Sequence, residues 1–342
     1  MSAREPMTVS DSGISNDTYI DAFRCMVLSR TFEDKIGALF RAGKVIGGVY
    51  LGRGQEAFSV ALGMQLDRSK GDVFSPLIRD QSGRLGFGEA LLDAARTYLG
   101  SVNGPMHGRD GNIHRGRPLE GMPAMISHLG SSVSVVNGML MGKRFKGEAG
   151  YVGGVTAGDG ATSTGAFHEG LNQAAVENLP LVVSVADNQF AYSTPTDRQY
   201  ACESLVERAS GYGVEGYSID GTDLSECLDT FRTAIGRARE GHGPQMVVGK
   251  LLRLSGHGEH DDASYVPDSV KAGHYGRDCI QAARTAMIEN EWLSSEVIEE
   301  LEQEAQQVVE QTVSQAQAEE SPDPAKDDWR VLSSSSLTEG EW

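Results

Sequence analysis

The sequence is short of cysteine, of basic residues and of long apolar runs, and each shortage excludes a class of protein. Its 4 cysteines lie far apart, which argues against a zinc knuckle, a redox dithiol or a disulfide framework. Only 30 basic residues face 48 acidic ones, and the net charge of -18 speaks against nucleic acid or an anionic membrane as a partner. No stretch approaches the roughly 18 apolar residues of a membrane span, and the first residues lack the apolar core of a secretory signal. We therefore expect a soluble, cytoplasmic protein.

What the chain does have is enough apolar sequence for a large core and many glycines. Its 342 residues are 39% hydrophobic, which suits one large domain or two ordinary ones. The 42 glycines exceed the usual share of ~7% and are scattered, as many tight strand-to-helix turns would require. From the polar ends we predict a flexible arm over 1–16, a domain over 17–320 and a flexible tail over 321–342.

Periodicity along the chain predicts helices at both ends of this domain and one long loop within it. Apolar residues recur at helical spacing over 19–42, and Gly43 is a suitable helix stop. The segment 104–130 is rich in glycine, has little periodicity and is too long for an ordinary connector, which indicates a functional loop. The segment 292–313 keeps an apolar stripe among acidic residues and predicts an acidic surface helix.

The most informative part of the sequence, 151–195, predicts a strand, a helix and a second strand. The apolar run YVGGVTA is followed by Gly158-Asp159-Gly160, and apolar residues over 167–175 then fall on one helix face. The run LPLVVSVA reads as a strand buried on both faces of a parallel sheet and ends at Asp187-Asn188. A further strand is expected over 244–254. The pattern predicts an α/β fold with a parallel sheet flanked by helices.

Asp159 and Asn188 follow these two strands directly. A right-handed crossover brings the carboxyl ends of both strands to the same sheet edge. One carboxylate and one amide oxygen form the incomplete shell that Mg²⁺ completes with water and ligand phosphates. The helix expected after Gly160 would direct free amides to the same place, so a diphosphate bridged through Mg²⁺ is the natural ligand. The alternative is that GDG is only a tight turn and Asp159 a helix cap. Two other phosphate-binding motifs do not match, because the segment lacks the glycine spacing of GxGxxG and the lysine of a P-loop.

The segment GDGATSTGAFHEGLNQAAVENLPLVVSVADNQFAYSTP resembles the thiamine-diphosphate motif of the alpha subunits of 2-oxo acid dehydrogenases. This group covers pyruvate, branched-chain 2-oxo acid and acetoin dehydrogenases. The similarity extends over most of the chain and includes RTFEDKIGALFRAGKVIGG, GQEA at 54–57 and AEESPDP near the end. It implies the thiamine-diphosphate-binding fold, of which this chain would supply the diphosphate-binding domain.

The resemblance implies a role for individual residues. The Mg²⁺ ion would be bound by Asp159, Asn188 and the backbone carbonyl of Phe190. Gly158, Gly160 and Ala161 would line the diphosphate. Arg79, in SPLIRD, matches the arginine that contacts the diphosphate, and its planar fork suits a phosphate. Ser127 and Leu129, in ISHLG, match positions beside the cofactor's rings, where the apolar side chain wedges the cofactor into its bent shape.

His257, in RLSGHGEHDD, matches the active-site histidine of the family's R-x-x-G-H loop, and its near-neutral pKa suits proton transfer. The same loop leaves open a metal site formed by His257, His260, Asp261 and Asp262, or a solvated loop histidine. His114 matches another family histidine near the site.

Three positions depart from the family. Ile78 replaces an aromatic residue that often precedes the arginine. Asp187 replaces a common asparagine and would add negative charge near the metal. Gly258 stands where regulated members carry a phosphorylatable serine, so kinase control at that position is excluded.

The resemblance implies oxidative decarboxylation of a 2-oxo acid, pyruvate or branched-chain, with acyl transfer to lipoamide. It also implies a beta subunit in a heterotetramer of two alpha and two beta chains, and a lipoyl domain of a dihydrolipoyl acyltransferase. Alternatives are an acetoin dehydrogenase alpha subunit, a non-catalytic cofactor-binding subunit of the same fold, and the self-contained thiamine-diphosphate enzymes, which usually need a longer chain.

Overall fold

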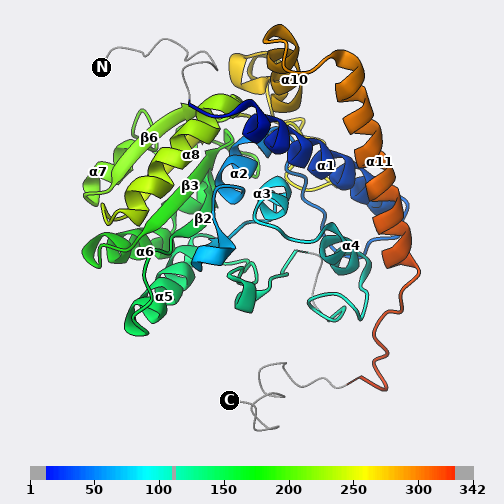
Figure 1. Ribbon diagram of the computed structural model, residues 1–342, viewed down its shortest axis with the longest axis horizontal. Coiled ribbons are helices and arrows are strands. Elements are labelled where there is room, and N and C mark those ends of the chain that lie inside the picture. Colours follow the sequence, from blue (N-terminus) through cyan, green and yellow to red (C-terminus); the bar gives the residue numbers. More distant parts are fainter. Residues whose placement is uncertain (1–12, 110–112, 328–342) are drawn as a thin grey trace.

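A five-stranded parallel sheet forms the centre of the computed structural model, which describes residues 13–109 and 113–327 (Figure 1). The strand order is β1-β2-β3-β7-β6, and every neighbouring pair is parallel. The strands are β1 (Val73–Ser75), β2 (Gly153–Gly158), β3 (Leu181–Asp187), β6 (Glu215–Asp220) and β7 (Gln245–Lys250). The predicted α/β fold with a parallel sheet flanked by helices is confirmed. Most of the predicted arm and tail, 1–12 and 328–342, lies outside the described residues.

Helices cover both faces of this sheet. The first face carries α2 (Glu56–Gly63) and α8 (Leu224–Arg239), and the second carries α5 (Ser131–Phe145), α6 (Gly165–Val176) and α7 (Glu207–Gly211). Every residue of β3 is buried, as its continuous apolar run predicts. Val182 joins the core under α2 and α8, whereas its neighbour Val183 joins the core under α5 and α6. This alternation places β3 between two apolar layers.

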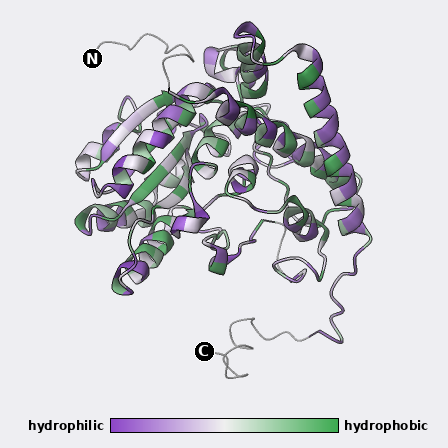
Figure 2. Ribbon diagram, viewed as in Figure 1, coloured by the Kyte–Doolittle hydropathy of each residue, from purple (hydrophilic) through white to green (hydrophobic). Residues whose placement is uncertain are grey.

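The remaining helices form an outer group beside the sheet. They are α1 (Asn16–Arg41), α3 (Gln81–Gly86), α4 (Leu91–Leu99), α9 (Asp268–Lys271), α10 (Cys279–Glu289) and α11 (Ser295–Gln317). α1 confirms the predicted first helix but begins earlier, because the Ser15 side chain caps it by accepting from the Thr18 amide. α11 confirms the acidic surface helix, with a buried apolar stripe and mainly hydrophilic residues elsewhere (Figure 2).

Two predicted boundaries were wrong near the sheet edge. The strand expected over 244–254 ends at Lys250, which pairs with Asp187 at the end of β3. Beyond that point Gln189 adopts a left-handed φ of 75°, so the chain after β3 is no longer an extended strand with which the residues after Lys250 could pair. The helix expected after Gly160 begins only at Gly165, after a 3-10 turn over Asp159–Ser163, because Thr164 caps it.

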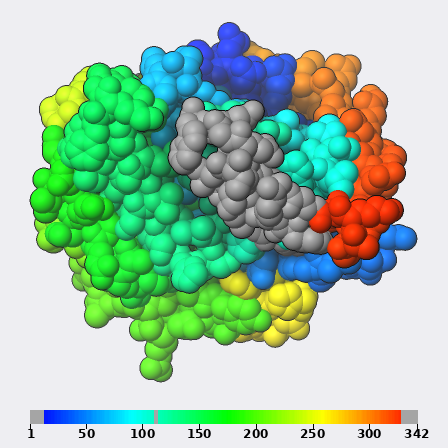
Figure 3. Space-filling view, turned by 90° about the horizontal axis from the view of Figure 1, so that it is seen from below, coloured from blue at the N-terminus to red at the C-terminus, as the bar shows by residue number. Residues whose placement is uncertain are grey.

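The end of the described chain is fastened to the segment that leads into the predicted functional loop. Arg96 Nη2 lies 2.6 Å from Glu319 Oε1, and the Val102 amide donates to the Glu320 carbonyl at 2.9 Å. Figure 3 shows this end of the chain (red) beside the 91–108 segment (cyan). The first part of the predicted tail, 321–327, therefore directly follows residues that are bonded to the rest of the chain.

All four cysteines lie within the described residues and are free. Among residues 13–109 and 113–327, no helix is both long enough and apolar enough to span a membrane.

A buried carboxyl group supports the loop that leads into α2. Both oxygens of Glu33, on α1, lie 3.0 Å from the Gly52 amide nitrogen. A Cβ at Gly52 would lie 2.2 Å from the Arg79 carbonyl oxygen, so the loop touches the backbone of the Arg79 segment directly. Burial, and next the nearby Glu56 carboxylate, raises the pKa of Glu33 to about 8.

This raised pKa predicts that stability falls as the pH rises from roughly 4.3 to about 8. Between the pKa of an unfolded glutamate, roughly 4.3, and about 8, the folded state binds a proton that the unfolded state lacks. The free energy of unfolding therefore decreases as pH rises through that window. We expect Glu33→Gln, which still accepts from Gly52, to weaken this pH dependence by about 1 kcal/mol or more between pH 6 and 9, measured by urea denaturation.

Glu310→Gln, at an exposed position on α11, is the matched control and should keep the wild-type pH dependence. Parallel curves for wild type and Glu33→Gln would show that this carboxyl group does not titrate in that range.

Candidate active site

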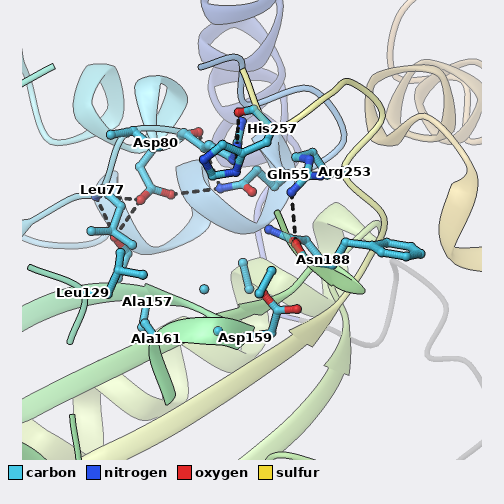
Figure 4. A pocket seen from close by; sticks show the side chains of 18 of the residues that line it. Gln55, Leu77, Asp80, Leu129, Ala157, Asp159, Ala161, Asn188, Arg253 and His257 are labelled. Carbon is cyan, nitrogen blue, oxygen red and sulfur yellow. Dashed lines mark hydrogen bonds between the residues drawn. The ribbon is translucent and has the colours of Figure 1, made fainter. Parts of the chain in front are cut away.

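A cavity of ≈ 300 Å³ lies at the carboxyl ends of β2 and β3, between these strands and the loop that carries His257 (Figure 4). Its wall contains all of the residues predicted for the site except Ser127 and His114. Those in the wall are Arg79, Leu129, Gly158, Asp159, Gly160, Ala161, Asn188, Phe190 and His257. The residues come from segments far apart in the sequence, so the tertiary fold brings the predicted set together.

Asp159 and Asn188 lie at adjacent strand ends, as their position after the two strands predicts. Gly158 pairs with Ala186 in the β2–β3 register, which places both polar residues at one edge. Burial raises the pKa of Asp159 to about 6, although a hydrogen bond from Gln199 to its Oδ2 at 2.9 Å opposes this shift. The Oδ1 of Asn188 is buried and has no hydrogen-bond partner among the residues that the structure describes. A buried acceptor without a donor, beside a carboxylate, fits a bound cation.

The Phe190 carbonyl lies in the same wall but is already engaged. Arg253 Nη1 donates to it at 3.0 Å, and Arg253 Nη2 donates to the Tyr192 carbonyl at 2.9 Å. A carbonyl oxygen has two lone pairs, so one remains for another partner. Arg253 thus fixes the hairpin of β4 (Phe190–Ala191) and β5 (Thr194–Pro195) at the site.

Two glycines shape the floor of the cavity for different reasons. Gly158 has ordinary extended dihedrals, φ -93° and ψ 168°, so its backbone does not require glycine. A Cβ there would meet nothing within 4 Å and would project into open space. A Cβ at Gly160 would lie 2.6 Å from the Ala191 Cβ, so this glycine permits close approach of the β4–β5 hairpin. The space that Gly158 leaves free is suited to a ligand group close to the backbone.

Arg79 presents a buried positive charge to this space. Its Nη1 donates to the Leu51 carbonyl at 2.9 Å, and its Nη2 donates to the His257 carbonyl. Burial, and next the repulsion of Arg253, lowers the pKa of Arg79 to about 10, so it stays charged at neutral pH. Within the described ranges no carboxylate lies within salt-bridge distance of it. A buried guanidinium held by two carbonyls and the His257 ring, none of which carries a negative charge, fits an anionic ligand.

His257 faces Arg79 and two aromatic rings. Its ring centroid lies 5.4 Å from that of Tyr50 and 4.5 Å from that of Tyr192. Burial, followed by repulsion from Arg79 and Arg253, lowers the pKa of His257 to about 4. The imidazole is therefore neutral at neutral pH and can accept a proton from a bound reactant.

Ser127 and His114 are the predicted residues that the structure does not bring to the cavity wall. Ser127 lies beside His114. It is exposed and lies 2.5 Å from His114 Nε2, so these two predicted residues pair with each other outside the cavity wall. Leu129, two residues further, does line the cavity and is half exposed.

The alternative metal site in the His257 loop is not formed. No group of three or more His, Cys, Asp or Glu side chains in the described residues is placed to hold a metal ion. Asp261 instead accepts from the His257 amide at 2.5 Å and from the Tyr265 hydroxyl at 2.7 Å, which fixes the loop.

The three positions at which the sequence departs from the family pattern can each be located in the structure. Ile78 lines the cavity, where an aromatic ring is common. The Asp187 carboxylate accepts from Gln189 and Tyr200 and lines a separate cavity, so its charge does not face the predicted metal ligands directly. At Gly258 a Cβ would meet the His260 ring at 2.7 Å, so even a small side chain would be crowded.

Sequence reasoning missed several residues of the cavity wall. Asp80 accepts from the Thr156 hydroxyl at 2.6 Å, and Gln55 lies 3.4 Å from the same carboxylate. This network ties the Arg79 segment to β2. A signal was present for some of these positions: Gln55 lies in GQEA, Asp80 follows Arg79 in SPLIRD, and Arg253 is the arginine of R-x-x-G-H.

Comparison with known proteins agrees with this arrangement. Residues 24–325 match the family model described as dehydrogenase E1 component. The alpha subunit of acetoin:2,6-dichlorophenolindophenol oxidoreductase from Cupriavidus necator is 30% identical, over 95% of this chain and 97% of its own. The 2-oxoisovalerate dehydrogenase alpha subunit of Bacillus subtilis is 33% identical over 74% and 76%, and the pyruvate dehydrogenase E1 alpha subunit of Rhizobium meliloti 28% identical over 90% and 88%. The chain therefore belongs to the dehydrogenase E1 component family and is similar to its alpha subunits.

Proposed function

We propose that the chain is the alpha subunit of a thiamine-diphosphate-dependent dehydrogenase that oxidatively decarboxylates a 2-oxo acid and transfers the acyl group to lipoamide. The observation that carries this proposal is the unpartnered Oδ1 of Asn188 beside the buried Asp159 carboxylate. These two oxygens adjoin the open space at Gly158 and the Arg79 guanidinium, so a cation and an anion fit side by side. A diphosphate neutralised by Mg²⁺ has this combination of charges.

Each predicted residue that lines the cavity then has a role. Asp159, Asn188 and the free lone pair of the Phe190 carbonyl would hold Mg²⁺. Gly158, Gly160 and Ala161 would line the diphosphate, Arg79 would neutralise it, and Leu129 would pack beside the cofactor rings. Thiamine diphosphate supplies, when bound, the nucleophilic carbon and the electron sink that decarboxylation needs.

His257 would handle protons for this chemistry. Its neutral imidazole is held beside Arg79 and flanked by two tyrosine rings, so it is oriented toward the cavity without a carboxylate partner. Its lowered pKa keeps it able to accept a proton at neutral pH. We assign it the exchange of a proton with the bound reactant or with the incoming lipoyl group.

The proposal includes two partners. Relatives of this chain are named as alpha subunits, which supports a beta subunit that would complete the site in a heterotetramer of two alpha and two beta chains. The acyl acceptor would be the lipoyl domain of a dihydrolipoyl acyltransferase. Neither Mg²⁺ nor these partners is needed to explain the fold itself.

Acetoin is a second candidate substrate. A relative that matches nearly the whole chain, in both directions, is the alpha subunit of an acetoin oxidoreductase. Coexpression with the beta subunit, followed by assays with pyruvate, branched-chain 2-oxo acids and acetoin and an artificial electron acceptor, separates these substrates. A complex that binds the cofactor but turns over none of them would instead be a non-catalytic cofactor-binding subunit.

Asp159→Ala should abolish both binding of thiamine diphosphate with Mg²⁺ and turnover, because the metal loses its only carboxylate ligand. Cofactor binding is measured by calorimetry on the complex with the beta subunit, and turnover with the electron acceptor. Asp197→Ala, an exposed acid in the neighbouring segment, is the control. Unchanged turnover of Asp159→Ala in the reconstituted complex would refute the metal site.

His257→Ala should retain cofactor binding but slow acyl transfer to lipoamide by about 10² to 10⁴-fold, the usual contribution of a positioned acid-base group. Cofactor affinity and single-turnover acyl transfer are measured separately on the same complex. The exposed His260 provides the control, His260→Ala, which should transfer at the wild-type rate. Normal transfer by His257→Ala would remove its catalytic assignment.

A further inference from the structure

Two consecutive side chains reach the acids at the ends of two adjacent strands. Gln199 Nε2 donates to Asp159 Oδ2 at 2.9 Å, at the end of β2. Tyr200 donates its hydroxyl to Asp187 Oδ2 at 3.2 Å, at the end of β3. Both follow the 3-10 turn over Thr196–Arg198, which lies beyond the β4–β5 hairpin. One short segment therefore connects the two strand ends behind the cavity.

The orientation of the Gln199 amide is determined by its partners. Its Nε2 also donates to the Thr194 carbonyl at 2.9 Å. A carboxylate and a carbonyl can only accept hydrogen bonds, so the nitrogen and not the oxygen must lie between them. The Gln199 backbone carbonyl accepts from Ser163 at 3.2 Å, which fastens this residue to the turn that starts at Asp159.

Gln199 itself stays outside the cavity. It is absent from the cavity wall, and a Cβ at Gly160 would lie 2.6 Å from Ala191 but 3.8 Å from Gln199 Oε1. Among the described residues the Gln199 Oε1 is buried without a hydrogen-bond partner, so the energetic gain of this side chain comes through its nitrogen.

We propose that Gln199 is a positioning residue that occupies one oxygen of Asp159 and so leaves a single oxygen to a metal ion. This inference rests on the proposed function. Mg²⁺ demands near-ideal octahedral geometry and usually takes carboxylates through one oxygen, so a carboxylate with one oxygen already bonded is suited to it. Groups that orient a metal ligand in this way typically change metal affinity about 10 to 100-fold when they are removed.

Gln199→Leu tests this role in the complex with the beta subunit. Mn²⁺ replaces Mg²⁺ as a probe because its free concentration can be followed by electron paramagnetic resonance in the presence of thiamine diphosphate. We expect the Mn²⁺ affinity to fall about 10-fold, while turnover at saturating metal stays close to wild type. Arg198→Gln, at the exposed preceding residue, should bind Mn²⁺ like wild type.

Gln199→Glu distinguishes positioning from direct ligation. An ionised glutamate cannot donate to Asp159, so it should weaken Mn²⁺ binding at least as much as Gln199→Leu. Wild-type affinity in either variant would overturn the positioning role. If the Gln199 variants bind Mn²⁺ like wild type but Asp159→Ala does not bind it, the positioning role is wrong and the proposed function stands. If Asp159→Ala also binds Mn²⁺ like wild type, both the positioning role and the proposed metal site are wrong.

Discussion

The parallel pairing of β2 with β3 is the constraint on which the site depends. Because Gly158 lies opposite Ala186, the next residues in each strand leave the sheet side by side. A slip of one residue in either strand would move Asp159 relative to Asn188 by about 3.3 Å and turn that strand's side chains to the opposite face. The register is determined by burial of both strands between two apolar layers, so the packing of the core also sets the distance between the candidate metal ligands.

Within residues 13–109 and 113–327, the charged groups at the ligand space form no ion pairs with one another. Arg79 and Arg253 both donate to backbone carbonyls, and their positive charge depresses the pKa of His257. Burying such charges without an anion is unfavourable, and a bound diphosphate would relieve part of this cost. The same ligand would bring negative charge close to His257 and raise its pKa again, so proton affinity at this residue depends on whether the site is filled.

The hairpin and turn that follow Asn188 connect these features. Arg253 fixes the backbone of the hairpin, and Gln199 and Tyr200 connect the next turn to the acids at the strand ends. Asp187, which departs from the family pattern, serves here as the acceptor for Tyr200 instead of facing the ligand space. The Asp187 carboxylate, which would add negative charge if it faced the metal, is thus engaged in a structural hydrogen bond.

The sequence by itself determined the α/β class, the central strand-helix-strand unit and the proximity of Asp159 and Asn188, because apolar periodicity reports which faces are buried and parallel strands end at one edge. It also indicated His257 and Arg79 through motif residues. Only the tertiary structure decided that Arg253, Gln199 and Asp80 support the site and that Ser127 pairs with His114 outside the cavity. Such contacts join residues far apart in the chain, and a polar side chain in a loop carries no periodic signal for its partner. The direction of the Asp187 carboxylate and the pKa shift of His257 likewise depend on burial and neighbouring charges, which exist only after folding.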